Sequence, residues 1–216
     1  MTSSIKAEDA KTKPCLISCS VLKSEIDRLQ RHGDMDIDVI YVSKMFHVDY
    51  KLLEKNLRKT IERTLSKASE KPILVYGDLC LGPNDEMKQL AQEYGLAKIN
   101  ALNCVDCLLG GRGKIDEVDP HHELMFFDPG MIEFFRLAKK KLMQEGMDEE
   151  ALRNMFNGIK GIVLLDTLGR AEKCIDEIKN LNTGLPILEI KKVGLENLKQ
   201  VLTESIEQAA SRKDNL

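Results

Sequence analysis

The sequence predicts a mainly parallel α/β fold, with a Rossmann- or flavodoxin-like doubly wound sheet that carries helices on both faces. Short apolar runs of strand length alternate along the chain with longer segments whose apolar residues recur at helical spacing. This alternation is typical of βαβ units, whose parallel strands are covered on both sides. The 216 residues are 43% hydrophobic and 31% charged, as in an ordinary globular domain.

Seven short apolar runs are strand-like. They are Cys15–Cys19, Ile37–Val42, Ile73–Tyr76, Lys98–Leu102, Glu123–Phe127, Ile162–Leu165 and Pro186–Ile190. Each segment between them carries an apolar stripe that predicts an amphipathic helix. These helices are expected over Val21–Arg31, Tyr50–Ser69, Asp85–Tyr94, Met131–Glu145, Arg170–Asn180 and Leu195–Ala210. A further short helix over Asp148–Phe156 has Asp148 as its expected N-cap.

Composition limits the class of protein. The first dozen residues lack the apolar core of a signal peptide, and no run reaches the roughly 18 apolar residues that a membrane span needs. With a net charge of -3, the chain lacks the excess of positive charge that is typical of nucleic-acid-binding proteins. We therefore expect a cytoplasmic protein with no membrane or nucleic-acid partner, built as a disordered tail (1–13) and a single α/β domain (14–216). The oligomeric state stays open.

The cysteines carry the functional prediction. Six cysteines in a reducing compartment more often bind metal, act in catalysis or lie buried than form disulfides. Cys19 ends the first predicted strand, and Cys80 and Cys107 lie a few residues past the third and fourth. Ligands of open α/β sheets bind at this carboxyl edge, where the strand order reverses. If the order is 2-1-3-4-5, three neighbouring strand ends span about 10 Å, so the thiols are expected to meet.

A shared pocket of thiols predicts a metal site. Cys19, Cys80 and Cys107 are the candidate ligands of zinc or an iron–sulfur cluster, with Cys104 of the single Cys-x-x-Cys motif as fourth ligand or free. His47, which follows the second strand, is the histidine placed to add a ligand. A structural role competes at each position, because free cysteine is among the most buried residue types.

The segment from Gly110 to Lys114 suggests a phosphate loop but fails the pattern. Leu108 stands where the earlier glycine belongs, and Ile115 replaces the magnesium-binding hydroxyl. A flexible turn is therefore favoured. Gly110, Gly111 and Arg112 are kept as candidate cofactor-binding residues, because the guanidinium could attract an anionic ligand.

At these residues the chain resembles a known family. The motifs are Ile17-Ser-Cys19-Ser-Val-Leu, Phe46-His-Val-Asp, Tyr76-Gly-Asp-Leu-Cys80, Asp106-Cys107-Leu-Leu-Gly-Gly and Pro129-Gly130. Together they are similar to the DUF1638 family, over about Cys15 to Phe135 and only loosely beyond. Relatives carry the cysteines that correspond to Cys19, Cys80 and Cys107. Two departures are a Tyr-Gly-to-cysteine spacing one residue longer than expected, and Met131 in place of tryptophan.

The resemblance also implies a metabolic setting. Relatives tend to be encoded near corrinoid-dependent methylamine methyltransferases, which implies a role in corrinoid-dependent methyl transfer or corrinoid reactivation. The implied partner is a corrinoid protein or a methylamine methyltransferase. The Asp-x-His-x-x-Gly signature of corrinoid carriers is absent from the chain, so corrinoid is expected only through that partner.

Three hypotheses follow. The first is a metal-thiolate protein, either a methyltransferase or a redox protein. The second is a metal-free Cys-x-x-Cys thiol oxidoreductase, whose motif opens a helix that lowers a thiol pKa. The third is a non-catalytic accessory module that docks on the methyltransferase or the corrinoid protein.

Overall fold

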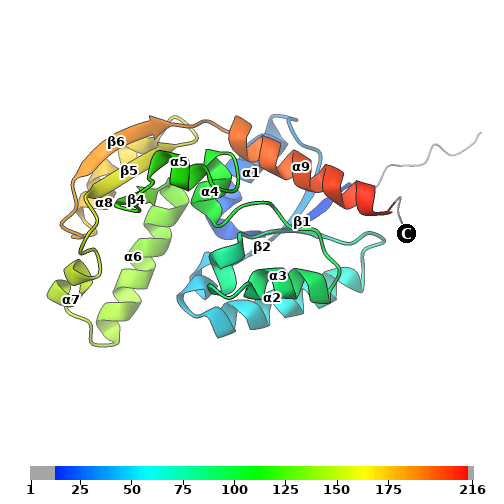
Figure 1. The fold of residues 1–216 in the computed structure, drawn as a ribbon, viewed down its shortest axis with the longest axis horizontal. Coiled ribbons are helices and arrows are strands. Elements are labelled where there is room, and N and C mark those ends of the chain that lie inside the picture. The colour runs from blue at the N-terminus through cyan, green and yellow to red at the C-terminus, as the bar shows by residue number, and fades with distance from the viewer. Residues whose placement is uncertain (1–12, 214–216) are drawn as a thin grey trace, which may run out of the picture.

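The computed structural model describes residues 13–213, which form two three-stranded parallel sheets surrounded by helices (Figure 1). The strands are β1 (Cys15–Cys19), β2 (Asp38–Val42), β3 (Ile73–Val75), β4 (Leu124–Phe127), β5 (Gly161–Asp166) and β6 (Ile187–Lys192). Their orders are β2-β1-β3 and β4-β5-β6, and every pairing is parallel. The predicted parallel α/β class is therefore confirmed, whereas the predicted tail lies outside the described residues except for Lys13.

The first sheet has the expected strand order 2-1-3. The remaining strands were expected to continue this sheet, but they form a separate second sheet. The segment predicted as a fourth strand, Lys98–Leu102, makes a single parallel bridge between Lys98 and Leu74. Beyond it the chain hydrogen-bonds to the turn after β3, where the amide of Asp78 donates to the carbonyl of Ala101 at 3.0 Å. A helix then begins at Cys104, so the next strand, β4, starts a second sheet with β5.

Helices occupy the segments in which the sequence predicted them. Of two further short helices, α4 was expected only under the oxidoreductase hypothesis, and α5 was not predicted. The α-helices are α1 (Lys23–Arg31), α2 (Tyr50–Leu65), α3 (Glu86–Glu93), α4 (Cys104–Leu109), α5 (Lys114–Val118), α6 (Pro129–Gln144), α7 (Glu149–Asn154), α8 (Ile175–Lys179) and α9 (Glu196–Lys213). The 3₁₀ turns are η1 (Ser20–Leu22), η2 (Lys44–Val48), η3 (Asp78–Leu81) and η4 (Ala171–Cys174). Asp148 caps α7 as predicted, because its side chain accepts from the amide of Ala151.

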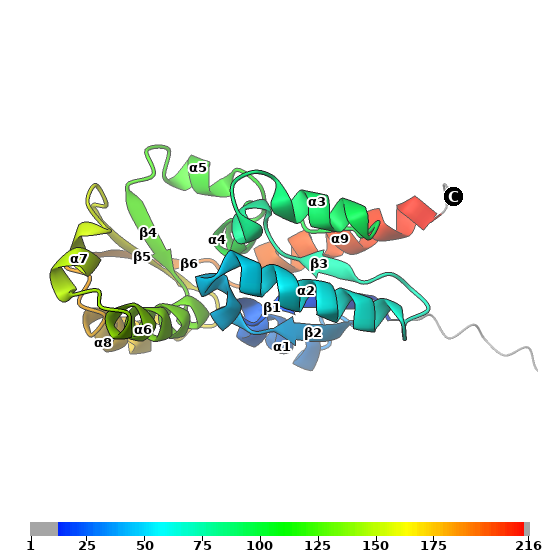
Figure 2. The same ribbon diagram turned by 90° about the horizontal axis from the view of Figure 1, so that it is seen from below.

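The first sheet is covered on both faces. Successive residues of β1 point to opposite sides, so Leu16 and Ile17 enter two different apolar clusters. Ile17 packs with residues of α2 and α3, while Leu16 packs with residues of α1 and α9. Figure 1 shows α9 above this sheet and α2 and α3 below it, and Figure 2 views the sheet from the side of α2 and α3.

The second sheet shares the core of the first. Phe127 and Leu164 pack on one of its faces with Ile132 of α6 and Ile178 of α8. Its other face contributes residues such as Val163 to the cluster that contains Leu16. The two sheets are thus joined by one continuous apolar cluster. Among the described helices, none has the length and apolar character needed to cross a membrane.

Candidate functional site

A cavity of about 250 Å³ lies at the carboxyl edge of the first sheet. Cys19 at the end of β1, His47 in η2, Cys80 in η3 and Cys104 at the start of α4 all line it. Its remaining wall is mainly apolar and aromatic. It includes Val21, Val75, Tyr76, Ile99, Met131 and Phe134. Three thiols and one imidazole therefore line one cavity at the edge where ligands of parallel α/β proteins bind.

The backbone brings the turns of this edge close together. Gly77 precedes η3, and a β-carbon placed there would lie 2.3 Å from the carbonyl oxygen of Leu102, so glycine permits the close approach. Asn103 caps α4 through its Oδ1, which accepts from the amide of Asp106 at 3.0 Å. These contacts hold the turn that carries Cys80 against the helix that begins at Cys104.

The loop after α4 is organised by one buried carboxylate. Asp106 is 0% exposed, and its oxygens accept from the amides of Leu102 at 2.9 Å, Gly113 at 3.2 Å and Ile115 at 3.1 Å. The loop is thereby folded back on the strand-like segment that precedes α4.

Among the candidate metal ligands that line this thiol cavity, Cys19 and His47 are in direct side-chain contact. The Sγ atom of Cys19 lies 3.8 Å from Nδ1 of His47 and accepts from the amide of Val21 at 3.4 Å. The imidazole stacks on Tyr76, with ring centroids 5.9 Å apart and an interplanar angle of 11°. Burial lowers the pKa of His47, so the ring is neutral at neutral pH.

The cavity thiols are protonated at neutral pH. Burial raises the pKa of Cys19 to about 12 and that of Cys80 to about 11. The pKa of Cys104 is raised well above its usual range, first by burial and then by the charges of Cys80 and Asp128. Reactive cysteines have lowered pKa values, so these thiols need a bound cation to become thiolates.

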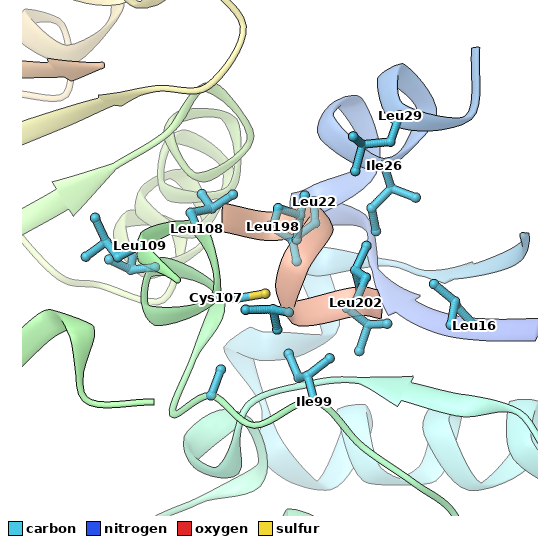
Figure 3. Close-up of a cluster of buried hydrophobic side chains, with 14 of the residues drawn as sticks. Leu16, Leu22, Ile26, Leu29, Ile99, Cys107, Leu108, Leu109, Leu198 and Leu202 are labelled. Carbon is cyan, nitrogen blue, oxygen red and sulfur yellow. The ribbon is translucent and has the colours of Figure 1, made fainter. Parts of the chain in front are cut away.

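Cys107 lies in the apolar core. It is 0% exposed and is not among the residues that line the cavity. Figure 3 shows it surrounded by apolar side chains, with its sulfur directed toward Leu198 and Leu202 of α9. The Cys-x-x-Cys motif does open a helix, α4, but it sends Cys104 to the cavity and Cys107 to the core.

The glycine-rich segment lies outside the thiol cavity. Gly110 caps α4 at φ 118°, and Gly111 has φ 107°. Nε of Arg112 donates to Oδ1 of Asn100 at 2.9 Å, and its guanidinium pairs with the buried carboxylate of Asp78. The amides of Gly110 and Gly111 donate to the carbonyls of Cys107 and Asp106, so all three candidate residues have partners within the fold.

The remaining cysteines lie elsewhere. Cys15 begins β1 at the opposite edge of the sheet, in a groove with Lys13 and Ile206. Cys174 ends η4 and packs partly against the cluster of the second sheet. All six cysteines are free thiols.

Tyr76 is a cavity residue that sequence reasoning did not select for a function, as are Lys44, Tyr50 and Asn103. Its ring lines the cavity and is 1% exposed. The sequence signal was its place directly before Gly77 at the end of β3, which was used only to support Cys80.

Within residues 13–213, no three His, Cys, Asp or Glu side chains are grouped as a metal site. Cys19 and His47 approach each other, while Cys80 and Cys104 line the same cavity without completing a group of three. The structure therefore presents metal-binding residue types around one cavity, in an arrangement that differs from a closed coordination shell.

These features define a class: a parallel α/β protein with a thiol-lined cavity at a sheet edge. Within that class the chain belongs to the DUF1638 family, whose model, described as a protein of unknown function (DUF1638), matches residues 41–213. No curated protein and no solved structure matches the chain. The matched range extends farther toward the C-terminus than the sequence resemblance and begins after Cys19, so Cys80 and Cys104 lie inside it.

Proposed function

We propose that the thiol cavity binds a transition-metal ion, zinc in the first place, through Cys19, Cys80, Cys104 and His47. The observation that carries the proposal is the 3.8 Å distance between Sγ of Cys19 and Nδ1 of His47. Zinc binds sulfur at about 2.3 Å and imidazole nitrogen at about 2.0–2.1 Å, so two such ligands at a tetrahedral angle stand about 3.6 Å apart. The pair already has nearly this separation.

The chemistry of the donor set supports zinc. A metal-bound histidine must be neutral, and burial keeps the pKa of His47 low. The thiol protons of Cys19 and Cys80, whose pKa values are about 12 and 11, would be displaced by the cation. Cys80 and Cys104 would have to move toward the Cys19–His47 pair to complete the shell.

Cys104 takes the place in this set that sequence reasoning gave to Cys107. Cys104 lines the cavity with Cys19 and Cys80, whereas Cys107 packs in the core on the other side of α4. Turning Cys107 into the cavity would remove a buried side chain from a close-packed cluster, which is unfavourable.

The cavity suggests what such a site would do. A zinc ion with an open position lowers the pKa of a bound thiol or water, which makes a nucleophile. The chain contributes apolar walls, including Met131 and Phe134, that exclude water from the thiols. Lys44 is the one cationic residue of the lining, and its ammonium is held by the carbonyl of Gly130 at 3.3 Å and by Glu133.

The family resemblance extends the proposal to a role. We propose that the site supports corrinoid-dependent methyl transfer or corrinoid reactivation together with a corrinoid protein or a methylamine methyltransferase. Tyr50 and Leu79 line the cavity and are 55% and 46% exposed, so a docking partner would meet apolar side chains beside the thiols. Co-purification with a corrinoid protein would test this part, and absence of any complex would count against it.

The metal-free oxidoreductase hypothesis has less support. It needs a thiol with a lowered pKa, whereas burial raises the pKa of both cysteines of the Cys-x-x-Cys motif. The two thiols also enter different environments, since Cys104 faces the cavity and Cys107 the core.

Metal analysis of anaerobically purified protein tests the proposal. We expect about one zinc per chain in the wild type, and a loss of at least about ten-fold in zinc affinity in Cys19→Ser, Cys80→Ser and Cys104→Ser. Each removes a ligand, and even changes outside the ligand shell cost about 10–100-fold in metal affinity. Cys174→Ser is the matched control and should bind zinc normally. Cys107→Ala should also keep zinc while losing roughly 1–2 kcal/mol of stability through the cavity it leaves in the core.

Each alternative result has a defined meaning. If the purified protein is brown and contains iron and sulfide, the proposed zinc ion must be replaced by an iron–sulfur cluster at the same cysteines. Wild-type protein that takes up neither metal would reject the metal-thiolate proposal. Zinc loss in Cys107→Ala with full zinc in Cys104→Ser would restore the ligand set predicted from the sequence.

A further inference from the structure

The hydroxyl of Tyr76 is the unexplained polar group of the cavity. Tyr76 lines the cavity and is 1% exposed, and its hydroxyl oxygen is buried without a hydrogen-bond partner in the described part of the chain. Buried hydroxyls are normally hydrogen-bonded, and leaving one without a partner costs about 1–3 kcal/mol. Phenylalanine would fill the same space without that cost.

The surroundings of Tyr76 explain why no side chain satisfies it. Its ring lies parallel to the imidazole of His47, and most of the other lining residues are apolar or carry thiols. Asn103 is a polar lining residue, and its Oδ1 is occupied by the amide of Asp106. The nearby Lys44 is already engaged by Gly130 and Glu133. A partner for the hydroxyl must therefore come from a molecule that enters the cavity.

We infer that the cavity binds a small neutral molecule with an apolar body and one hydrogen-bond acceptor, which the Tyr76 hydroxyl positions. The cavity of about 250 Å³ is far larger than the about 10–15 Å³ that one water requires. Its apolar lining, including Ile99, Met131 and Phe134, suits an alkyl body, and the unpartnered hydroxyl of Tyr76 offers a hydrogen bond to one acceptor. This ligand shares the cavity of the proposed metal site, but its recognition by Tyr76 does not require the metal.

The test compares two probes of nearly equal shape. Butanone has a carbonyl acceptor, and 2-methyl-1-butene replaces that oxygen by a methylene group. Dissociation constants for both are measured by NMR titration of wild-type protein and Tyr76→Phe, each in metal-free and zinc-loaded form. We expect the preference for butanone over the alkene to fall about five-fold in Tyr76→Phe, because one net hydrogen bond is lost. Differences in probe hydration cancel in this comparison.

Tyr94→Phe is the matched control. The Tyr94 hydroxyl donates to Glu62 at 2.8 Å on the surface and does not line the cavity, so the probe preference should not change. Tyr76→Phe should also unfold at the same temperature as the wild type or higher without ligand, because it removes an unpartnered hydroxyl.

Three outcomes would overturn the inference. They are an unchanged probe preference in Tyr76→Phe, no binding of either probe at the cavity residues, or a lower unfolding temperature of the ligand-free variant. Zinc content measured on the same samples separates this inference from the proposed function. Normal zinc with no change in preference rejects the ligand inference alone, and absent zinc with the expected change rejects the metal proposal alone.

Discussion

Asp128 shows how a single residue can serve the fold at a cost that depends on pH. It is 0% exposed and caps α6, where Oδ1 accepts from the amides of Gly130 at 2.6 Å and Met131 at 3.2 Å. Its other oxygen, Oδ2, is buried and has no hydrogen-bond partner within the described residues. Burial, followed by the nearby charge of Glu25, raises the pKa of Asp128 to about 7.

We expect Asp128→Asn to weaken the pH dependence of stability. The folded-state pKa of about 7 lies above the unfolded value of about 3.9, so the proton is held more tightly in the folded protein. The stability from Asp128 is therefore complete below about pH 4 and is lost as the pH rises to about 7. The loss is at most about 4 kcal/mol. Asparagine can still cap α6, so the variant should gain stability relative to the wild type at pH 8.

Urea unfolding at pH 5, 6, 7 and 8 measures this effect. Asp148→Asn is the control, because Asp148 also caps a helix but is exposed to solvent. It should leave the pH dependence unchanged. If the unfolding free energies of the wild type and Asp128→Asn change with pH in the same way, the pKa of Asp128 is not raised in the folded protein and the prediction is wrong.

Sequence reasoning at the residue scale succeeded where the position along a strand decides the outcome. Cys19 and His47 follow adjacent parallel strands, so their meeting could be predicted from topology. The choice between Cys104 and Cys107 could not, because both lie on one short helix and their directions depend on how α4 packs against α9. That packing is a tertiary property of the fold.

At the scale of elements, the amphipathic patterns located most helices and six of the seven predicted strands. Cys15–Cys19 has the predicted bounds, and α2 ends at Leu65, four residues before its predicted end. The segment Lys98–Leu102 was predicted as a strand because it is an apolar run of strand length. It forms one bridge only, since the chain leaves the sheet to approach Gly77, a tertiary contact with no local signal.

Gly77 therefore determines how closely η3 and the start of α4 can approach each other. Its φ of -76° is accessible to any residue, so the requirement for glycine is purely steric. Gly77→Ala would place a β-carbon 2.3 Å from the Leu102 carbonyl oxygen and force the two elements apart. We expect a loss of about 3 kcal/mol in unfolding free energy and a reduced zinc affinity, because Cys80 would move away from Cys104.

Gly33→Ala is the comparison for this prediction. Gly33 has φ 75°, and nothing lies within 4 Å of the position that a β-carbon would occupy there. Only backbone strain of about 1 kcal/mol is therefore expected, and zinc binding should be unaffected. Chemical denaturation of both variants measures the loss of unfolding free energy, and metal analysis measures their zinc binding. Equal destabilisation of the two variants, with zinc retained in both, would show that η3 and α4 tolerate a wider spacing.

At the scale of the whole molecule, the two sheets are expected to unfold together. A single apolar cluster contains Leu16 and Val75 from the first sheet and Phe126 and Leu165 from the second. The sequence predicted a single domain, and it could not reveal that the strands divide into two sheets, because strand pairing between distant segments leaves no local pattern. The shared cluster gives the divided sheet a common core, and this predicts cooperative unfolding.

A buried hydrogen bond connects the two halves beside that core. Thr167, directly after β5, donates from Oγ1 to Oε1 of Glu25 on α1 at 2.8 Å, and both residues are buried. The other oxygen of Glu25, Oε2, has no hydrogen-bond partner among residues 13–213. Thr167→Val keeps the side-chain shape but leaves the whole carboxyl group without a side-chain donor. We expect a loss of about 1–3 kcal/mol in a single transition, because the shared core still couples the sheets.

Circular dichroism and methyl NMR signals of Ile17 and Ile162 would follow the two sheets separately. Thr203→Val, at an exposed position of α9, should change stability by less than about 0.5 kcal/mol. Separate midpoints for Ile17 and Ile162 in the wild type would mean that each sheet folds on its own, and the cavity would then border a unit that is stable without β4, β5 and β6.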